Sequence, residues 1–246
     1  MPGRPVAAAT RAAKACRDNR PMGTLYLVRH GQASFGADNY DLLSPLGQRQ
    51  CQRLGEYFAA KGRVFTTVIT GTLVRQIQSQ QAIVAATATI GATPEPLRLP
   101  GLNEYDSHAV ISAFHPQPLP KPDTPELYRH HFRLLRQALA AWMAGTTQPA
   151  GMPSYPEFAA GVAAALAHVR TQCEGDVLMV SSGGPISTVV GQVLGAAPEV
   201  TIELNMRIRN SAVSEFTFNP KRHALLTFNT LPHLEADAFA DWVTHA

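Results

Sequence analysis

The stretch LYLVRHGQASFG, residues 25–36, decides the fold of this chain. It begins as a short apolar run rich in strand-favouring residues, which is typical of a strand buried on both faces. The run ends in Arg29, His30 and Gly31, which supply a cation, an imidazole and a residue without a side chain. Because parallel α/β sheets bind ligands at the carboxyl ends of their strands, this triplet indicates a functional site.

Strand and helix patterns alternate along the rest of the chain. Ser44 and Pro45 are a typical helix start and Gly62 a typical stop, so a helix is expected between them. This alternation predicts an α/β fold, namely a three-layer α/β/α sandwich around a mostly parallel sheet. Strands are expected at 24–29, 64–70, within 95–106, at 176–182 and in a terminal hairpin of 210–220 and 223–230; further helices are expected at 73–88, 125–145, 155–172 and 184–195.

Residues 107–152 interrupt this alternation. They combine the proline-rich stretch HPQPLPKPDTP, residues 115–125, with an amphipathic helix pattern. Proline removes a ladder hydrogen bond, so that stretch does not suit a central strand. We therefore expect a helical and proline-rich insertion that lies as a lid over one end of the sheet. Because no long linker divides the chain, we expect a single domain of residues 23–246.

The positive charge of the chain is concentrated at its beginning. Residues 1–22 hold five basic residues against one acidic residue, a net charge of +4, so the remainder carries −1 of the total +3. Because residues 23–246 are nearly neutral, they do not generate the positive electrostatic potential that attracts nucleic acid. We expect residues 1–22 to form a disordered extension; a targeting peptide, or a true start at Met22, remain alternatives.

Hydrophobicity and cysteine spacing exclude further classes of protein. No apolar stretch approaches the roughly 18–20 residues that span a bilayer, so no membrane contact is expected. Cys16, Cys51 and Cys173 are odd in number and widely spaced, which argues against disulfides and zinc. These features favour a cytoplasmic location.

Chemically distinctive residues follow four of the expected strands. Besides the triplet at 29–31 they include Arg75, Glu104 and the stretch Ser181-Ser182-Gly183-Gly184. Together, in this order, they resemble the histidine phosphatase superfamily, the phosphoglycerate-mutase-like proteins, over about Thr24 to Thr230.

The resemblance implies a phosphatase that acts on a small phosphorylated substrate through a phosphohistidine. Arg29 and Arg75 would bind the phosphate through their guanidinium groups, which are permanently charged and can each donate two parallel hydrogen bonds. His30 would attack phosphorus through one unprotonated ring nitrogen. Glu104 would protonate the leaving group, which requires a raised pKa. Gly31 would let the main chain approach the phosphate, while Gln32 and Ser34 would contact it or cap the loop. No metal or cofactor is implied.

One departure from the family pattern concerns Ser182. The family has a histidine there, before the glycine pair that begins with Gly183, and serine offers one neutral donor in place of a charged one. Losing a preorganised donor costs on the order of 10²–10³ in rate, so a slow enzyme is expected. Backbone N–H groups at the start of the next helix, or His108, are candidate substitutes.

Two alternatives to a phosphatase stay open at this stage. The first is a binder of phosphorylated ligands that has lost turnover. The second is a phosphoglycerate-mutase-type phosphotransferase, which is disfavoured because residues 151–158, GMPSYPEF, lack the Gly-Glu pair of the sugar-phosphate mutases. The natural substrate and the oligomeric state are not predicted.

Overall fold

A computed structural model describes residues 22–34, 41–120 and 123–245. The expected extension lies outside these residues except for Met22, as does Cys16. Among the described residues, Cys51 and Cys173 are buried free thiols, and no helix is long and apolar enough to cross a membrane.

The central sheet has six strands in the order β3-β2-β4-β1-β5-β6. The strands β1, β2, β3 and β4 are mutually parallel, whereas β5 and β6 form an antiparallel hairpin that joins the sheet beside β1. The predicted mostly parallel sheet and terminal hairpin are therefore confirmed. The strands are β1 Gly23–Arg29, β2 Thr67–Thr70, β3 Leu97–Arg98, β4 Asp176–Ser181, β5 Val213–Phe218 and β6 His223–Thr230.

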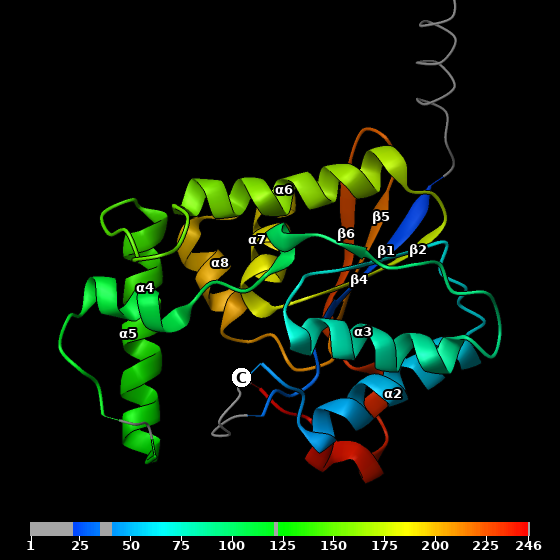
Figure 1. The fold of residues 1–246 in the computed structure, drawn as a ribbon, viewed down its shortest axis with the longest axis horizontal. Helices are drawn as coiled ribbons and strands as arrows, with labels where there is room; N and C mark the ends of the chain where they lie inside the picture. The colour runs from blue at the N-terminus through cyan, green and yellow to red at the C-terminus, as the bar shows by residue number, and fades with distance from the viewer. Residues whose placement is uncertain (1–21, 35–40, 121–122, 246) are drawn as a thin grey trace, which may run out of the picture.

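Helices cover both faces of the sheet (Figure 1). The helices α2 Pro45–Ala60 and α3 Val74–Thr87 pack on one face, and α6 Tyr155–Gln172 and α7 Gly183–Leu194 pack on the other. The side chains of β1 alternate between the two cores, as the two-residue period of a strand requires. Leu25 and Leu27 join the core under α6 and α7, and Tyr26 and Val28 join the core under α2 and α3.

Local sequence signals explain where α2 begins and ends. The Ser44 hydroxyl accepts a hydrogen bond from the Gly47 N–H at 3.0 Å, and Pro45 occupies the first turn. Gly62 follows the helix with φ +64°, a left-handed conformation that glycine adopts readily. The second strand is shorter than the 64–70 expected. It pairs with β4, which begins only at Asp176, so residues 64 and 65 have no neighbouring strand to bond.

The expected insertion is more helical than its composition indicates. It contains α4 Ser107–Phe114, where no helix was expected, and α5 Pro125–Met143, which was expected. A short helix that the sequence analysis did not assign, α8 Pro198–Asn205, packs against them (Figure 1). The three helices share a separate hydrophobic cluster that comprises Val110, Ile111, Leu135, Ala138, Leu139, Trp142 and Ile202.

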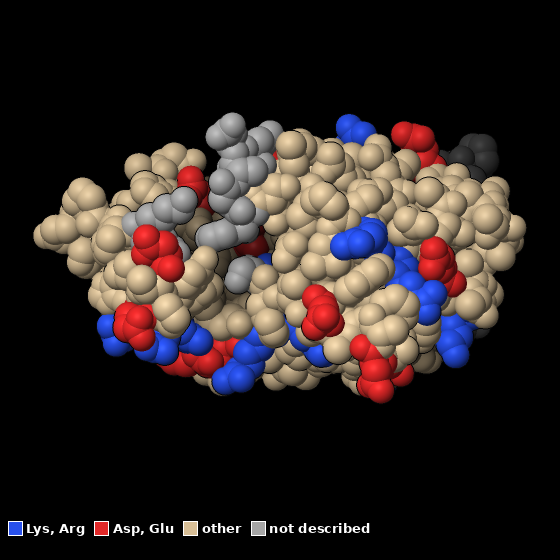
Figure 2. All heavy atoms as spheres, turned by 90° about the horizontal axis from the view of Figure 1, so that it is seen from below, with Lys and Arg blue, Asp and Glu red and all other residues tan. Residues whose placement is uncertain are grey.

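After β6 the chain returns beneath α2. Two 3-10 helices, Pro232–Leu234 and Asp237–Trp242, form a small cluster with Ala212, and Phe239 and Trp242 lie under arginines of α2. This path brings residues 243–245 back to the carboxyl end of β1. Figure 2 shows Lys and Arg interspersed with Asp and Glu over the face it presents.

His233 should make the stability of this fold depend on pH. Its side chain is 3% exposed, its Nε2 lies 2.9 Å from the Ser211 hydroxyl, and burial lowers its pKa to about 3. Between pH 6.5 and about 3 the unfolded chain therefore binds more protons than the folded chain, so stability is full above pH 6.5 and declines below it. We expect His233 alone to reduce the free energy of unfolding by about 2 kcal/mol at pH 5 relative to pH 7.5.

Urea denaturation at both pH values measures this effect. A His233→Gln variant, which keeps a hydrogen-bonding side chain but does not titrate, should lose less stability on acidification than the original protein. Equal losses in the two proteins would contradict the assignment.

Candidate active site

His30 is fixed at the carboxyl end of β1 by hydrogen bonds to both neighbouring strands' ends. Its N–H donates to the Ser181 carbonyl at 2.9 Å, and its carbonyl accepts from the Ser211 N–H at 3.2 Å. Arg29, the last residue of β1, is 5% exposed and donates to the Ile208 carbonyl. The backbone at this point thus cannot shift without disturbing both sides of the sheet.

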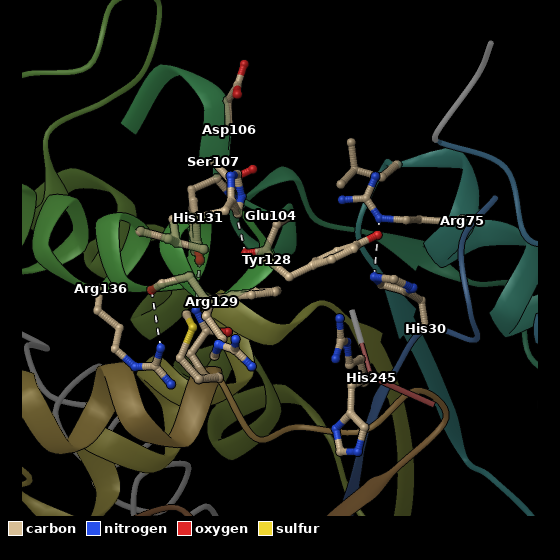
Figure 3. Close-up of a pocket in the computed structure, with 17 residues that line it drawn as sticks. His30, Arg75, Glu104, Asp106, Ser107, Tyr128, Arg129, His131, Arg136 and His245 are labelled. Atoms are coloured by element: carbon tan, nitrogen blue, oxygen red, sulfur yellow. Dashed lines mark hydrogen bonds between the residues drawn. The ribbon is translucent and has the colours of Figure 1, made fainter. Parts of the chain in front are cut away.

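The ring of His30 has a defined tautomer and direction. Its Nδ1 lies 2.7 Å from the Gly31 carbonyl, which can only accept, so Nδ1 carries the proton. Its Nε2 accepts a hydrogen bond from Arg75 Nε at 3.2 Å (Figure 3). Burial, followed by the positive charges of Arg29 and Arg75, lowers the pKa of His30 well below its usual value. The imidazole is consequently neutral, with the Nε2 lone pair directed at Arg75.

Arg75 is held in place by Asp41, a residue that the sequence analysis did not select. Arg75 lies in the first turn of α3, and its Nη1 donates to Asp41 Oδ1 at 2.7 Å. The other carboxylate oxygen of Asp41 accepts from the Val74 N–H at 2.9 Å. Asp41 therefore caps the start of α3 and orients the guanidinium toward His30 at the same time.

Glu104 follows the 3-10 helix Pro100–Leu102 and meets the start of α7. Both of its carboxyl oxygens accept from the Gly184 N–H, at 3.0 and 3.2 Å. Burial raises the pKa of Glu104, although the Gly184 hydrogen bond and the charges of Arg75 and Arg29 act in the opposite direction. The effect of burial on the pKa of Glu104 therefore outweighs the effects of the hydrogen bond and of the two arginines.

These four side chains line one cavity of about 770 Å³, together with the insertion (Figure 3). From α5, Tyr128 points toward the wall that His30 and Arg75 form. His131 also lines the cavity. Other lining residues are Leu73, Tyr105, Asp106, Ser107, Arg129, Phe132, Leu135, Arg136, Asn205, Met206 and His245.

The residues directly after His30 serve the scaffold. A Cβ on Gly31 would lie 2.4 Å from the Gly47 carbonyl oxygen of α2, so glycine is required for packing against that helix. The expectation that Gly31 clears space for phosphate is corrected accordingly. Gln32 accepts from the Ser44 hydroxyl at 2.7 Å, and the Ser34 N–H donates to the Leu42 carbonyl at 2.8 Å. None of the three lines the cavity.

Ser182 and Gly183 lie just behind the cavity wall. Ser182 is fully buried at the start of α7, and its hydroxyl accepts from Gln76 Nε2 at 2.8 Å. A Cβ on Gly183 would lie 2.6 Å from Asn205 Oδ1. His108, a candidate substitute for the missing histidine, is exposed on α4 and does not line the cavity.

The positive charge at the cavity floor comes from arginine side chains. Across the described parts of the chain, no group of three or more His, Cys, Asp or Glu side chains is arranged to hold a metal ion. Arg29 and Arg75 supply forked donors of the kind that bind planar or tetrahedral oxyanions.

A mostly parallel α/β sheet thus presents a neutral imidazole beside two arginines, an arrangement suited to binding an oxyanion such as phosphate. The family model of the histidine phosphatase superfamily (branch 1) matches residues 25–112 and 121–231, and the chain belongs to this superfamily. No curated protein sequence matches the chain.

Solved structures share the fold at low sequence identity. Phosphoglycerate mutase from Bacillus anthracis is 16% identical with a TM-score of 0.60, over 88% of this chain and 96% of its own. Phosphoserine phosphatase from Entamoeba histolytica, solved with 3-phosphoglyceric acid, is 21% identical with a TM-score of 0.59, over 86% and 99%. The α-ribazole phosphatase from Shigella flexneri is 19% identical with a TM-score of 0.59, over 85% and 96%.

A Gly31→Ala variant distinguishes packing from phosphate approach. The added Cβ meets backbone atoms of α2, which cannot give way easily, so we expect a loss of about 3 kcal/mol in the free energy of unfolding without ligand. A Gly62→Ala variant is the control: it meets no atom within 4 Å and should cost about 1 kcal/mol through its left-handed φ alone. Chemical denaturation measures both. Unchanged stability of Gly31→Ala would restore the original interpretation.

Proposed function

We propose that this protein is a metal-independent phosphatase that hydrolyses phosphate monoesters through a phosphohistidine on His30. The observation that carries the proposal is the neutral ring of His30, whose Nε2 lone pair faces the cavity floor beside Arg75. A nucleophilic imidazole must be unprotonated on one nitrogen and fixed on the other, and His30 meets both conditions.

Arg29 and Arg75 would bind the phosphate dianion. Both are buried, so their attraction for an anion is screened far less than that of surface arginines. A phosphoryl group placed against Arg75 Nε would replace the hydrogen bond that now runs to His30 Nε2, and would leave phosphorus next to that nitrogen. Binding of the phosphate to Arg75 would therefore also free His30 Nε2 and place it next to phosphorus.

The chemistry would proceed in two balanced steps. His30 Nε2 attacks phosphorus, the bond to the ester oxygen breaks, and protonated Glu104 gives its proton to the departing alkoxide. The Glu104 carboxylate then takes a proton from water, the water oxygen attacks phosphorus, and the bond between phosphorus and nitrogen breaks. Inorganic phosphate leaves and His30 is restored.

The substrate would be a small phosphorylated molecule whose leaving group lies against residues 107–152. The cavity extends beyond the catalytic residues, and α5 lines that part with Tyr128, Phe132 and the cations Arg129 and Arg136. Hydrolysis is favoured over a phosphoglycerate-mutase-type transfer because residues 151–158 lack the Gly-Glu pair. Ser182 does not line the cavity, and its hydroxyl is bonded to Gln76, so it supplies no donor to the phosphate. Turnover should therefore be slower than that of a relative with histidine at this position.

Trapping the phosphoenzyme tests the proposed nucleophile. The protein is mixed with p-nitrophenyl phosphate, quenched in alkali because phosphohistidine is labile to acid, and digested for mass spectrometry. We expect an added phosphoryl group on the peptide that contains His30, and loss of both that group and turnover in His30→Ala. A His108→Ala variant should behave like the original protein, because His108 lies outside the cavity. Phosphate affinity without turnover or a trapped peptide would indicate a binding protein instead.

The pH dependence for different leaving groups tests Glu104. An alkyl phosphate needs a proton from Glu104, so its kcat/KM should fall as pH rises through the raised pKa of that residue. p-Nitrophenyl phosphate has a leaving group that departs as an anion, so its kcat/KM should be much less sensitive in the same range. In Glu104→Gln we expect a loss of about 10²-fold or more for the alkyl substrate and a smaller loss for the aryl one. Identical profiles for both substrates would remove Glu104 from this role.

A further inference from the structure

We infer that His245 donates a hydrogen bond to the transferring phosphoryl group, in the position that Ser182 leaves without an imidazole. This inference deepens the proposed phosphatase function and rests on it. His245 follows the last 3-10 helix and lies far from the signature residues in sequence, so no motif draws attention to it.

The location of His245 is the first support. It lines the same cavity as Arg29, His30, Arg75 and Glu104, and its ring lies on the side of the cavity where β1 ends, opposite α5 (Figure 3). Arg29 acts on the pKa of both His245 and His30, so both imidazoles lie within the field of one guanidinium.

A network of buried hydrogen bonds is the second support, because it fixes the segment that carries His245. Gln50, which is fully buried in α2, donates through Nε2 to the Trp242 carbonyl at 2.6 Å and to the Thr244 hydroxyl at 2.9 Å. Thr244 pairs with Asn210 through two bonds of 3.0 Å, one from the Asn210 N–H to its carbonyl and one from its hydroxyl to Asn210 Oδ1.

Asn210 connects this segment to the nucleophile. Its Nδ2 donates to the His30 carbonyl at 3.4 Å, and it is 2% exposed. Residue 244 is thus joined to the backbone of residue 30 through a single buried side chain.

Among the candidates for an imidazole or its replacement, Ser182 and the other histidines near the site are less well placed. The Ser182 hydroxyl is occupied by Gln76 behind the cavity wall, and His108 lies outside the cavity. His131 lines the opposite wall, on α5, and its pKa is lowered by burial and by His130, with no contribution from Arg29 or Arg75. His245 is the histidine that shares the electrostatic surroundings of the nucleophile.

The chemistry requires only an N–H group. Without ligand, partial burial and the charges of Arg29 and Arg209 lower the pKa of His245, and a neutral imidazole still carries one N–H. As charge develops on the phosphoryl oxygens, this donor stabilises the transition state more than the ground state. His245 forms no covalent bond and transfers no proton in this scheme.

Two substitutions at position 245 test the donor, with p-nitrophenyl phosphate as substrate. We expect His245→Ala to lower kcat by about 10²-fold with a smaller change in KM, as for the loss of one preorganised donor. His245→Gln, which keeps an N–H donor, should recover part of this loss, and added imidazole should partly restore His245→Ala. His108→Ala is the matched control and should keep full activity. All variants should unfold at nearly the same temperature, because residue 245 is exposed and its side chain makes no core contact among the described residues.

A binding measurement separates this inference from the proposed function. Inorganic vanadate adopts a trigonal-bipyramidal geometry like that of phosphoryl transfer, and calorimetric titration measures its affinity without turnover. We expect His245→Ala to bind vanadate about tenfold more weakly, even if the unaltered protein proves inactive as a phosphatase. Turnover and vanadate affinity within twofold of the unaltered protein, or equal losses in His245→Gln and His245→Ala without rescue by imidazole, would overturn the inference.

Discussion

The contact between Arg75 Nε and His30 Nε2 is the constraint on which the rest of the site depends. A guanidinium keeps its protons under all ordinary conditions, so the ring nitrogen that faces it must accept. The same cation, together with Arg29 and burial, keeps the pKa of His30 low. One arrangement therefore fixes both the charge state and the direction of the His30 ring.

The scaffold makes this contact possible by bringing distant segments to one edge of the sheet. Since β1 lies between β4 and β5, the backbone of His30 is bonded to residues from both neighbours. Helix α3 follows β2 and delivers Arg75, while the start of α7 after β4 presents the Gly184 N–H to Glu104. His30, Arg75 and Glu104 are thus positioned after the ends of three different strands, which explains why residues so far apart in sequence converge.

The sequence predicts the parts of the site that follow strand ends and misses those placed by tertiary packing. Arg75 and Glu104 could be selected because apolar runs precede them and family motifs surround them. Asp41 and His245 could not, because their positions depend on the capping of α3 and on buried Gln50. The contribution of α5 could not be predicted for a similar reason: its pattern defines an apolar side but does not show that the helix faces the cavity. The short helices α4 and α8 lack the length that makes a periodic pattern recognisable.

Ser182 has a structural role behind the cavity. Its hydroxyl accepts from Gln76 Nε2, and the same amide nitrogen donates to the Leu102 carbonyl at 2.8 Å. Gln76 therefore ties the start of α7 to the turn that carries Glu104, and both partners are buried. Ser182 therefore takes part in a structural hydrogen bond that supports the placement of Glu104. With this position committed to structure, any further donor to phosphate must reach the cavity from another element of the fold.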